Sequence, residues 1–204
     1  MPQYLIELRV DMPDGVDPTT WMAAVIDRST PPGAAHPYQP TILRYRKMEP
    51  LWAPPQDGRR VIDAFTGPHR FLSNFHPCPV KVGTTTFPSS EHAFQAAKSK
   101  DSKQDWPRFA DPKVSPAEAK RMGRQVALRE DWEEKKIPVM RRIVQLKFTQ
   151  NPDLGDLLLS TGDALLVEGN TWGDIFWGVC RGTGQNWLGR ILMEVRDQLR
   201  KEHP

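Results

Sequence analysis

Cysteine is scarce in this chain, with only Cys78 and Cys180 among 204 residues. The two lie far apart and in no paired motif, which argues against a disulfide framework and favours a reducing compartment. Long apolar runs are also missing, since no stretch approaches the roughly 20 residues that cross a membrane. The N-terminus lacks the basic-then-apolar order of a signal peptide. We therefore expect a cytoplasmic protein with no membrane partner.

Motifs for metals and nucleotide phosphates are missing as well. The five histidines show neither HxxxH nor Cys/His ligand spacing. No GxxxxGK loop and no GxSxG elbow occurs, and Cys180 has no obvious partner base. The Gly182–Gly184 segment resembles half of a dinucleotide fingerprint but precedes no βαβ unit. The sequence thus predicts no metal and no bound cofactor.

Charge is nearly balanced, with 28 Lys and Arg against 25 Asp and Glu, a net charge of +3. This balance does not demand nucleic acid as a partner, although local basic patches stay open. The length suits one domain with a sizeable core, or such a domain with a small appendage.

Residues 1–60 differ in pattern from the rest. Alternation predicts strands over 4–10 and 41–46, with a short helix over 17–26 between them and a proline-rich linker over 51–58. We expect a small β-containing N-terminal appendage and assign it no function. Docking of a protein or nucleic-acid partner is an open alternative to a solvated face, and its candidate residues are Arg44, Arg46, Lys47, Arg59 and Arg60.

Residues 61–204 predict an α+β, helix-rich domain. Capping signals predict helices over about 90–100, 115–128, from 131 and from 152 to 161, with a kink or restart at Pro138. Segment 100–113 looks irregular, anchored by Trp106 and Phe109. The remaining expected elements are a strand over 61–65, a hairpin at Gly83, a strand over 164–168, a loop over 169–185 and a last helix capped by Asn186.

The helix that Ser89 is expected to cap carries polar residues on one stripe. Glu91, Gln95 and Lys98 recur at i, i+4 and i+7, where a helix that only covers a core would place apolar groups. A catalytic stripe and a solvated stripe both fit this spacing. His92 points about 100° away, so we expect a structural hydrogen bond from it.

A second candidate is the loop after Glu168, which is rich in glycine, tryptophan, Asn170 and Asp174. Aromatic faces and short polar side chains suit a pocket for a sugar or nucleotide. A tight turn whose tryptophans fill the core is the alternative, and the sequence leaves both open.

Together and in this order, several segments resemble the YbiA-like / NADAR family over roughly residues 61–198. Pro138 departs from the family's pattern in the helix after Trp132, and the first 60 residues are not covered. The matching residues are Phe71–Phe75, Phe87–His92 with Phe94, Gln95 and Lys98, Asp131–Trp132, Lys147–Phe148, Thr161–Gly162, Glu168–Asn170, Asp174, Trp177–Gly178, Asn186 and Leu188–Gly189.

The resemblance implies an α+β N-glycosidase. Members of the family remove ribose 5-phosphate from early riboflavin-pathway intermediates, and others remove ADP-ribose from guanine in nucleic acid. Carried over by motif, the catalytic positions are Glu91, Trp132 and Asp174, with Lys98 a further candidate. We add a set of substrate-binding candidates for sugar hydroxyls, phosphate or the base: Arg70, Ser73, Asn74, Phe75, Gln95, Asn170, Trp177 and Arg181.

Two chemical routes fit these residues. Glu91 and Asp174 can act as a carboxylate pair around C1 of the sugar. Alternatively, Lys98 attacks the ring-opened imine and forms a Schiff base while Glu91 moves protons. A module that binds NAD or ADP-ribose without turnover is the alternative function.

Overall fold

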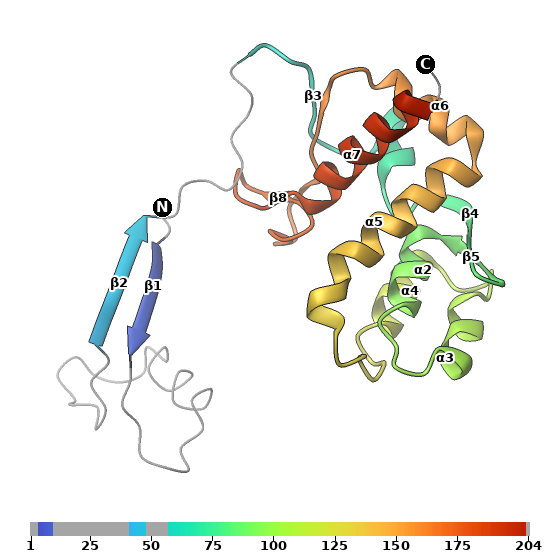
Figure 1. Cartoon of the computed structure of the whole chain (residues 1–204), viewed down its shortest axis with the longest axis horizontal. Coiled ribbons are helices and arrows are strands. Elements are labelled where there is room, and N and C mark those ends of the chain that lie inside the picture. The colour runs from blue at the N-terminus through green and yellow to red at the C-terminus, as the bar shows by residue number, and fades with distance from the viewer. Residues whose placement is uncertain (1–3, 10–40, 48–56, 203–204) are drawn as a thin grey trace. The chain divides into compact units, whose positions relative to one another are not determined.

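The two strands expected near the N-terminus pair with each other. The protein is described by a computed structural model that covers residues 4–9, 41–47 and 57–202 (Figure 1). It forms two compact units, residues 1–49 and 50–204. In the first unit, β1 (Tyr4–Arg9) lies antiparallel to β2 (Thr41–Lys47). The helix expected over 17–26 and most of the expected linker lie outside the described residues.

Short strands frame the second unit. β4 (Pro77–Val82) and β5 (Thr85–Ser89) form the predicted hairpin, and Gly83 turns it with a φ of 60° that favours glycine. β3 (Val61–Ile62) pairs in parallel with β6 (Leu165–Leu166). β7 (Gly169–Asn170) pairs in parallel with β8 (Val179–Cys180) inside the segment expected to be a loop.

Helices build most of this unit, and together with the strands they confirm the α+β class. α2 packs against α3, α4 and α5, and the long α5 runs beside α7, as the yellow and red ribbons of Figure 1 show. No helix among the described residues is long and apolar enough to cross a membrane. The helices are η1 (Gly67–Leu72), α2 (Ser90–Ala96), α3 (Ser102–Phe109), α4 (Pro116–Met122), α5 (Trp132–Gln150), α6 (Pro152–Ser160) and α7 (Trp187–Glu202).

The prediction that segment 100–113 is irregular is wrong, because this segment contains α3. The Asp101 carboxylate caps this helix by accepting from the backbone N–H of Gln104 at 3.1 Å. The two expected anchors are confirmed: Phe109 is buried, and the Trp106 ring lies edge-on to Phe87 at 5.5 Å. The polar surface of the helix hid its period in the sequence.

Helix ends also differ from expectation. α2 ends at Ala96, so Lys98 follows the helix instead of lying within it. α4 stops at Met122, six residues before the expected end at Leu128, with Gly123 as its C-cap. α5 continues through the exposed Pro138, and Asp131 makes no side-chain capping bond to it.

Candidate active site

Several hydrogen bonds hold the start of α2, next to Glu91. The Ser89 hydroxyl accepts from the backbone N–H of His92 at 3.4 Å and lies 2.8 Å from His92 Nδ1. His92 Nε2 lies 2.8 Å from the carbonyl oxygen of Val114. The backbone N–H of Glu91 donates to the carbonyl of Asn74 at 3.0 Å. These bonds confirm His92 as a structural residue and fix the backbone from which Glu91 projects.

Glu91 and Gln95 form a buried pair. Gln95 Nε2 donates to Glu91 Oε1 at 2.7 Å, and the residues are only 6% and 4% exposed. Burial raises the pKa of Glu91, although the Gln95 bond and the charges of Lys120 and Lys98 oppose this. The alternative that this stripe faces solvent is therefore wrong for Glu91 and Gln95. Gln95 orients the carboxylate of Glu91, and we assign it no other contact.

Lys98 lies against an aromatic wall. Its Nζ is 5.6 Å from the Phe94 ring centroid and 6.0 Å from that of Trp132. Phe94 in turn packs against Trp132 at 5.2 Å and Trp177 at 5.3 Å. Burial lowers the pKa of Lys98, and Glu91 pulls it back up. A partly desolvated amine beside a carboxylate is what a lysine nucleophile needs.

Asn170 and Asp174 organise the loop between β7 and β8. Asn170 Oδ1 accepts from the N–H of Asp174 at 3.0 Å, and Asn170 Nδ2 donates to the Asp174 carbonyl at 2.7 Å. Asp174 Oδ1 then accepts from the N–H groups of Phe176 at 3.1 Å and Trp177 at 2.8 Å. The turn is real, but Trp172 at its tip is 66% exposed and fills no core. The second oxygen of Asp174 accepts no hydrogen bond from the described residues.

Three charged residues belong to this centre although sequence reasoning gave them no role. Burial raises the pKa of Glu168 to about 7, and the charge of Asp174 raises the pKa of both Glu168 and Glu91. Lys120 lowers the pKa of Glu91, Lys98 and Glu168, and its Nζ lies 5.8 Å from the Phe75 ring.

Lys147 is the third, and it is 1% exposed. Its Nζ donates to the carbonyl of Ser73 at 2.8 Å, and burial lowers its pKa to about 8. The signal that could have found it is its place on the apolar stripe of α5, between Val144 and Phe148. No comparable signal marks Lys120, since α4 is polar on several sides.

The remaining candidates differ in exposure: Asn74 is buried, Ser73 and Phe75 are half-buried, and Arg70 and Arg181 are exposed. The Ser73 hydroxyl accepts from the N–H of Phe75 at 3.2 Å, and buried Asn74 contacts Met140 Sδ at 3.3 Å while its Oδ1 has no partner among the described residues. Arg70 and Arg181 are exposed, and neither takes part in the hydrogen bonds or pKa shifts of Glu91 and Glu168.

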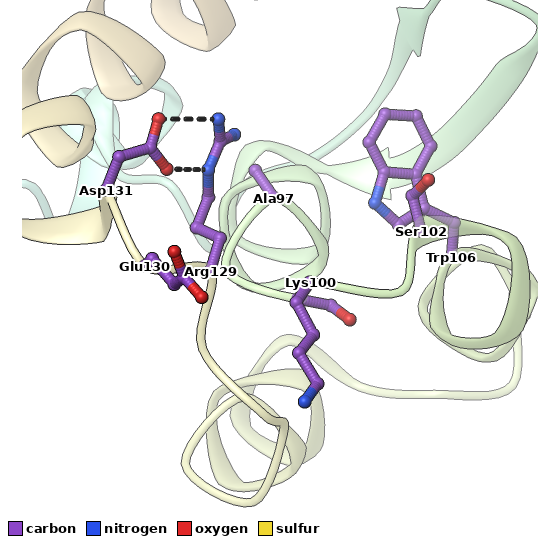
Figure 2. A pocket seen from close by; sticks show the side chains of 8 residues that line it. Ala97, Lys100, Ser102, Trp106, Arg129, Glu130 and Asp131 are labelled. Carbon is purple, nitrogen blue, oxygen red and sulfur yellow. Dashed lines mark hydrogen bonds and ion pairs between the residues drawn. The ribbon is translucent and has the colours of Figure 1, made fainter.

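A surface hollow of about 590 Å³ lies beside this centre, at the C-terminal end of α2. Figure 2 shows Arg129 paired with Asp131 on one side of it and Trp106 on the other. None of the predicted site residues lines it. The described residues also contain no group of three His, Cys, Asp or Glu side chains that could hold a metal ion.

Comparison with known proteins agrees with this architecture. Residues 63–200 match the NADAR domain. The chain is 45% identical over 133 residues to the N-glycosidase YbiA of Escherichia coli (strain K12), which covers 63% of this chain and 80% of that protein. It is 38% identical over 137 residues to an N-glycosidase of Nostoc punctiforme, covering 65% of this chain and 87% of that protein.

A longer relative and a solved structure complete the comparison. A riboflavin biosynthesis protein of Vibrio vulnificus is 44% identical over 140 residues, 67% of this chain but 37% of that protein, so this chain spans little more than a third of it. The NMR structure of E. coli YbiA superposes with a TM-score of 0.61 at 39% identity, covering 76% of this chain and 95% of that one. Sequence and fold agree, and the chain belongs to the NADAR domain family.

Proposed function

We propose that the protein is an N-glycosidase that hydrolyses the bond between a ribosyl group and the nitrogen of a base. The observation that carries this is the buried Glu91, oriented by Gln95 and set beside the desolvated amine of Lys98. Its relatives from E. coli and Nostoc punctiforme are named N-glycosidases. Breaking a C1–N bond develops positive charge on the sugar, which a carboxylate at C1 stabilises.

The environment of Lys98 favours the Schiff-base route over direct attack by water. In this route the glycosylamine opens to an imine, Lys98 Nζ adds to C1, and the base departs as an amine. Water then adds to the enzyme imine and releases the free sugar and the lysine. Glu91, which lowers the energy of the nearby cation, accepts and returns the protons. Trp132 and Phe94 exclude water from the amine.

Within this class we favour a small ribosyl phosphate as the substrate. The relative from Vibrio vulnificus is named for riboflavin biosynthesis, which favours the ribosylamino-pyrimidine intermediates of that pathway as substrates. Lys120 supplies a cation beside the carboxylates for the phosphate, and the exposed Arg70 and Arg181 stay predictions for the same contact. ADP-ribose linked to guanine in nucleic acid is the larger substrate of the same chemical class. A cytoplasmic location suits either one.

The test is mass spectrometry of products from a ribosylamino-pyrimidine phosphate and a guanine-ADP-ribosylated oligonucleotide, run side by side. Release of ribose 5-phosphate from the first supports the metabolite reaction, and release of ADP-ribose from the second supports the nucleic-acid reaction. Borohydride added during turnover should fix the sugar to Lys98, and Lys98→Met should abolish the adduct. Thermal stabilisation by ADP-ribose with no sugar released from either substrate would instead make the protein a binding module.

A further inference from the structure

Glu168 lies between β6 and β7, and contacts with two other segments hold its backbone. Its N–H donates to Asn186 Oδ1 at 3.0 Å, and its carbonyl accepts from the N–H of Val179 at 2.9 Å. Gly178 packs so closely that an added Cβ would lie 2.2 Å from the Glu168 carbonyl oxygen and 3.1 Å from its Cγ. The backbone and the first part of the side chain are therefore both held in one place.

Asn186 serves this purpose instead of capping α7 as expected. It has a φ of 53°, and its Nδ2 donates to the Leu166 carbonyl at 2.9 Å while its Oδ1 holds Glu168. Gly189 makes room for it, since a Cβ there would lie 2.5 Å from Asn186 Nδ2. Two glycines and an asparagine thus position one glutamate.

One oxygen of the Glu168 carboxylate has no hydrogen-bond partner among the described residues. Oε2 of Glu168 is buried and accepts no hydrogen bond from the described residues. The charged groups that face it are Asp174 and Glu91 on one hand, and Lys120 and Lys147 on the other. A buried carboxyl oxygen without a donor is costly unless a proton or a ligand satisfies it.

The three carboxylates of the centre differ in how many donors they receive. Glu91 accepts a hydrogen bond from Gln95, and Asp174 accepts hydrogen bonds from two backbone N–H groups. Glu168 receives no such bond on Oε2 and is repelled by the other two. When carboxylates share a site, the one with the fewest donors is the one that keeps a proton.

We propose that Glu168 is the acid that delivers a proton to the departing nitrogen, an inference that rests on the N-glycosidase function proposed above. As the bond between C1 and the nitrogen breaks, its electron pair stays on the nitrogen and the Glu168 proton joins it, so the base leaves as a neutral amine. Glu168 is then a carboxylate, and it recovers a proton from the water that adds to C1. Glu91 remains the base and charge stabiliser of the sugar side.

The decisive experiment compares wild type and Glu168→Gln on N-aryl ribosylamine 5-phosphates that differ only in the electron withdrawal of the aryl ring. Loss of the acid should lower kcat by about 100-fold or more for a basic, poor leaving amine. The loss should shrink steadily as ring substituents make the amine a better leaving group. The wild-type rate should fall above about pH 7, and Glu168→Gln should lack this decline. Glu194→Gln, an exposed α7 residue paired with Arg141, is the matched control and should keep wild-type behaviour.

A purely structural role for Glu168 predicts a different result. It would lower kcat equally for all leaving amines and leave the pH profile unchanged, and that outcome would overturn the proposal. If Glu168→Gln does not fold, the wild type alone decides, because a steep dependence of its kcat on amine basicity without a solvent deuterium isotope effect excludes proton donation. Failure of the proposed function is separate, since the wild type would then release no sugar from any substrate.

Discussion

At the scale of single residues, the buried surroundings of a carboxylate have two effects. They lower the stability of the protein, and they shift the pKa of the group toward values that suit acid–base catalysis. Glu91 is 6% exposed, and burial raises its pKa against the opposing effect of Gln95, Lys120 and Lys98. Such a group holds free energy that folding has to supply, because the charged form loses its hydration. Substitution of Glu91 separates this cost from its function.

Glu91→Gln should remove activity while sparing the fold. The amide keeps the size of the side chain and removes the buried charge, so the melting temperature at pH 8 should be unchanged or higher. The rate of sugar release should fall by about 100-fold or more, as expected for loss of a general acid–base group. Glu118→Gln on the exposed face of α4 is the control. Full activity in Glu91→Gln would refute the mechanism in either of its routes.

Asp174 has two separable roles, one through its hydrogen bonds and one through its charge. Asp174→Asn keeps an oxygen for the N–H groups of Phe176 and Trp177, so the loop and the melting temperature should stay as in the wild type. Its lost charge should lower the pKa of Glu168, because Asp174 is one of the groups that raise it. The alkaline decline of kcat should therefore move to lower pH.

Asp174→Ala is the companion variant, and it loses both roles. It should melt at a lower temperature than Asp174→Asn, since two backbone N–H groups lose their acceptor. Equal melting temperatures for the two variants would show that Asp174 does not act through the loop. A wild-type pH profile in both variants would show that it does not act through its charge.

At the scale of elements, the contact between α2 and α4 sets the geometry of the carboxylate. A Cβ on Gly123 would lie 1.9 Å from Gln95 Oε1 and 2.9 Å from Gln95 Cβ. Gly123→Ala should therefore displace Gln95 from Glu91 and lower activity by roughly 10-fold, with a destabilisation of about 1–3 kcal/mol from overpacking. Kinetics and thermal melts of the single variant measure both effects.

The reason for that loss can be isolated with a double-mutant cycle. If Gly123→Ala acts through Gln95, it should cost little further activity in a Gln95→Ala background, because the displaced group is already absent. Additive losses would show that the two positions act independently and that α4 does not position the Glu91–Gln95 pair.

Local signals explain which elements the sequence predicted well. Ser89 fixed the start of α2, and glycine at 83 fixed the hairpin, because both act through neighbours within three residues. α3 was missed because its anchors Phe87 and Ala96 lie outside the segment, where Trp106 contacts them. The strand at 164–168 and the loop after it were placed correctly, but the pairing of β7 with β8 depends on contacts the sequence does not display.

At the scale of the whole molecule, the site is assembled from segments that are distant in sequence. Motif resemblance pointed to Glu91, Lys98, Trp132 and Asp174, and their roles remain predictions. The resemblance included Glu168 without giving it a role, and it did not include Lys120. The significance of both comes from their proximity to each other across α4 and the β6–β7 junction. Arg70 and Arg181 were chosen for charge alone, and burial and hydrogen bonding give them no part in the centre.

The domain containing the site should function without the first unit. Residues 50–204 form their own compact unit, and the NADAR match begins at residue 63. A chain of residues 50–204 is expected to unfold in one cooperative transition and to release sugar from a small ribosyl substrate at the wild-type rate. Circular dichroism melts and product analysis measure these properties. Loss of activity in a folded fragment would instead give residues 1–49 a role in the reaction.

The pH dependence of stability offers a test that needs no substrate. Burial raises the pKa of Glu168 from 4.5 to about 7, so the folded state prefers the protonated form. Stability from this group is complete below the pKa of the unfolded chain and is lost as the pH rises through about 7. The free energy of unfolding of Glu168→Gln, relative to wild type, should thus rise by about 2–3 kcal/mol between pH 5 and pH 8.

Comparing the two proteins isolates Glu168 from the other titrating groups. Burial lowers the pKa of His76 and of His92, which destabilises both proteins alike as the pH falls through the usual range of histidine. Lys147, whose pKa of about 8 is low for a lysine, contributes stability that is lost in both as the pH falls through about 8. These contributions cancel in the difference between the free energies of unfolding of the two proteins. The exception is the effect of Glu168 on the pKa of Lys147, which Glu168→Gln removes. Urea unfolding of both proteins at pH 5, 6, 7 and 8 measures this difference in the free energy of unfolding. A difference that stays constant across this range would show that Glu168 is ionised at pH 5 in the folded protein.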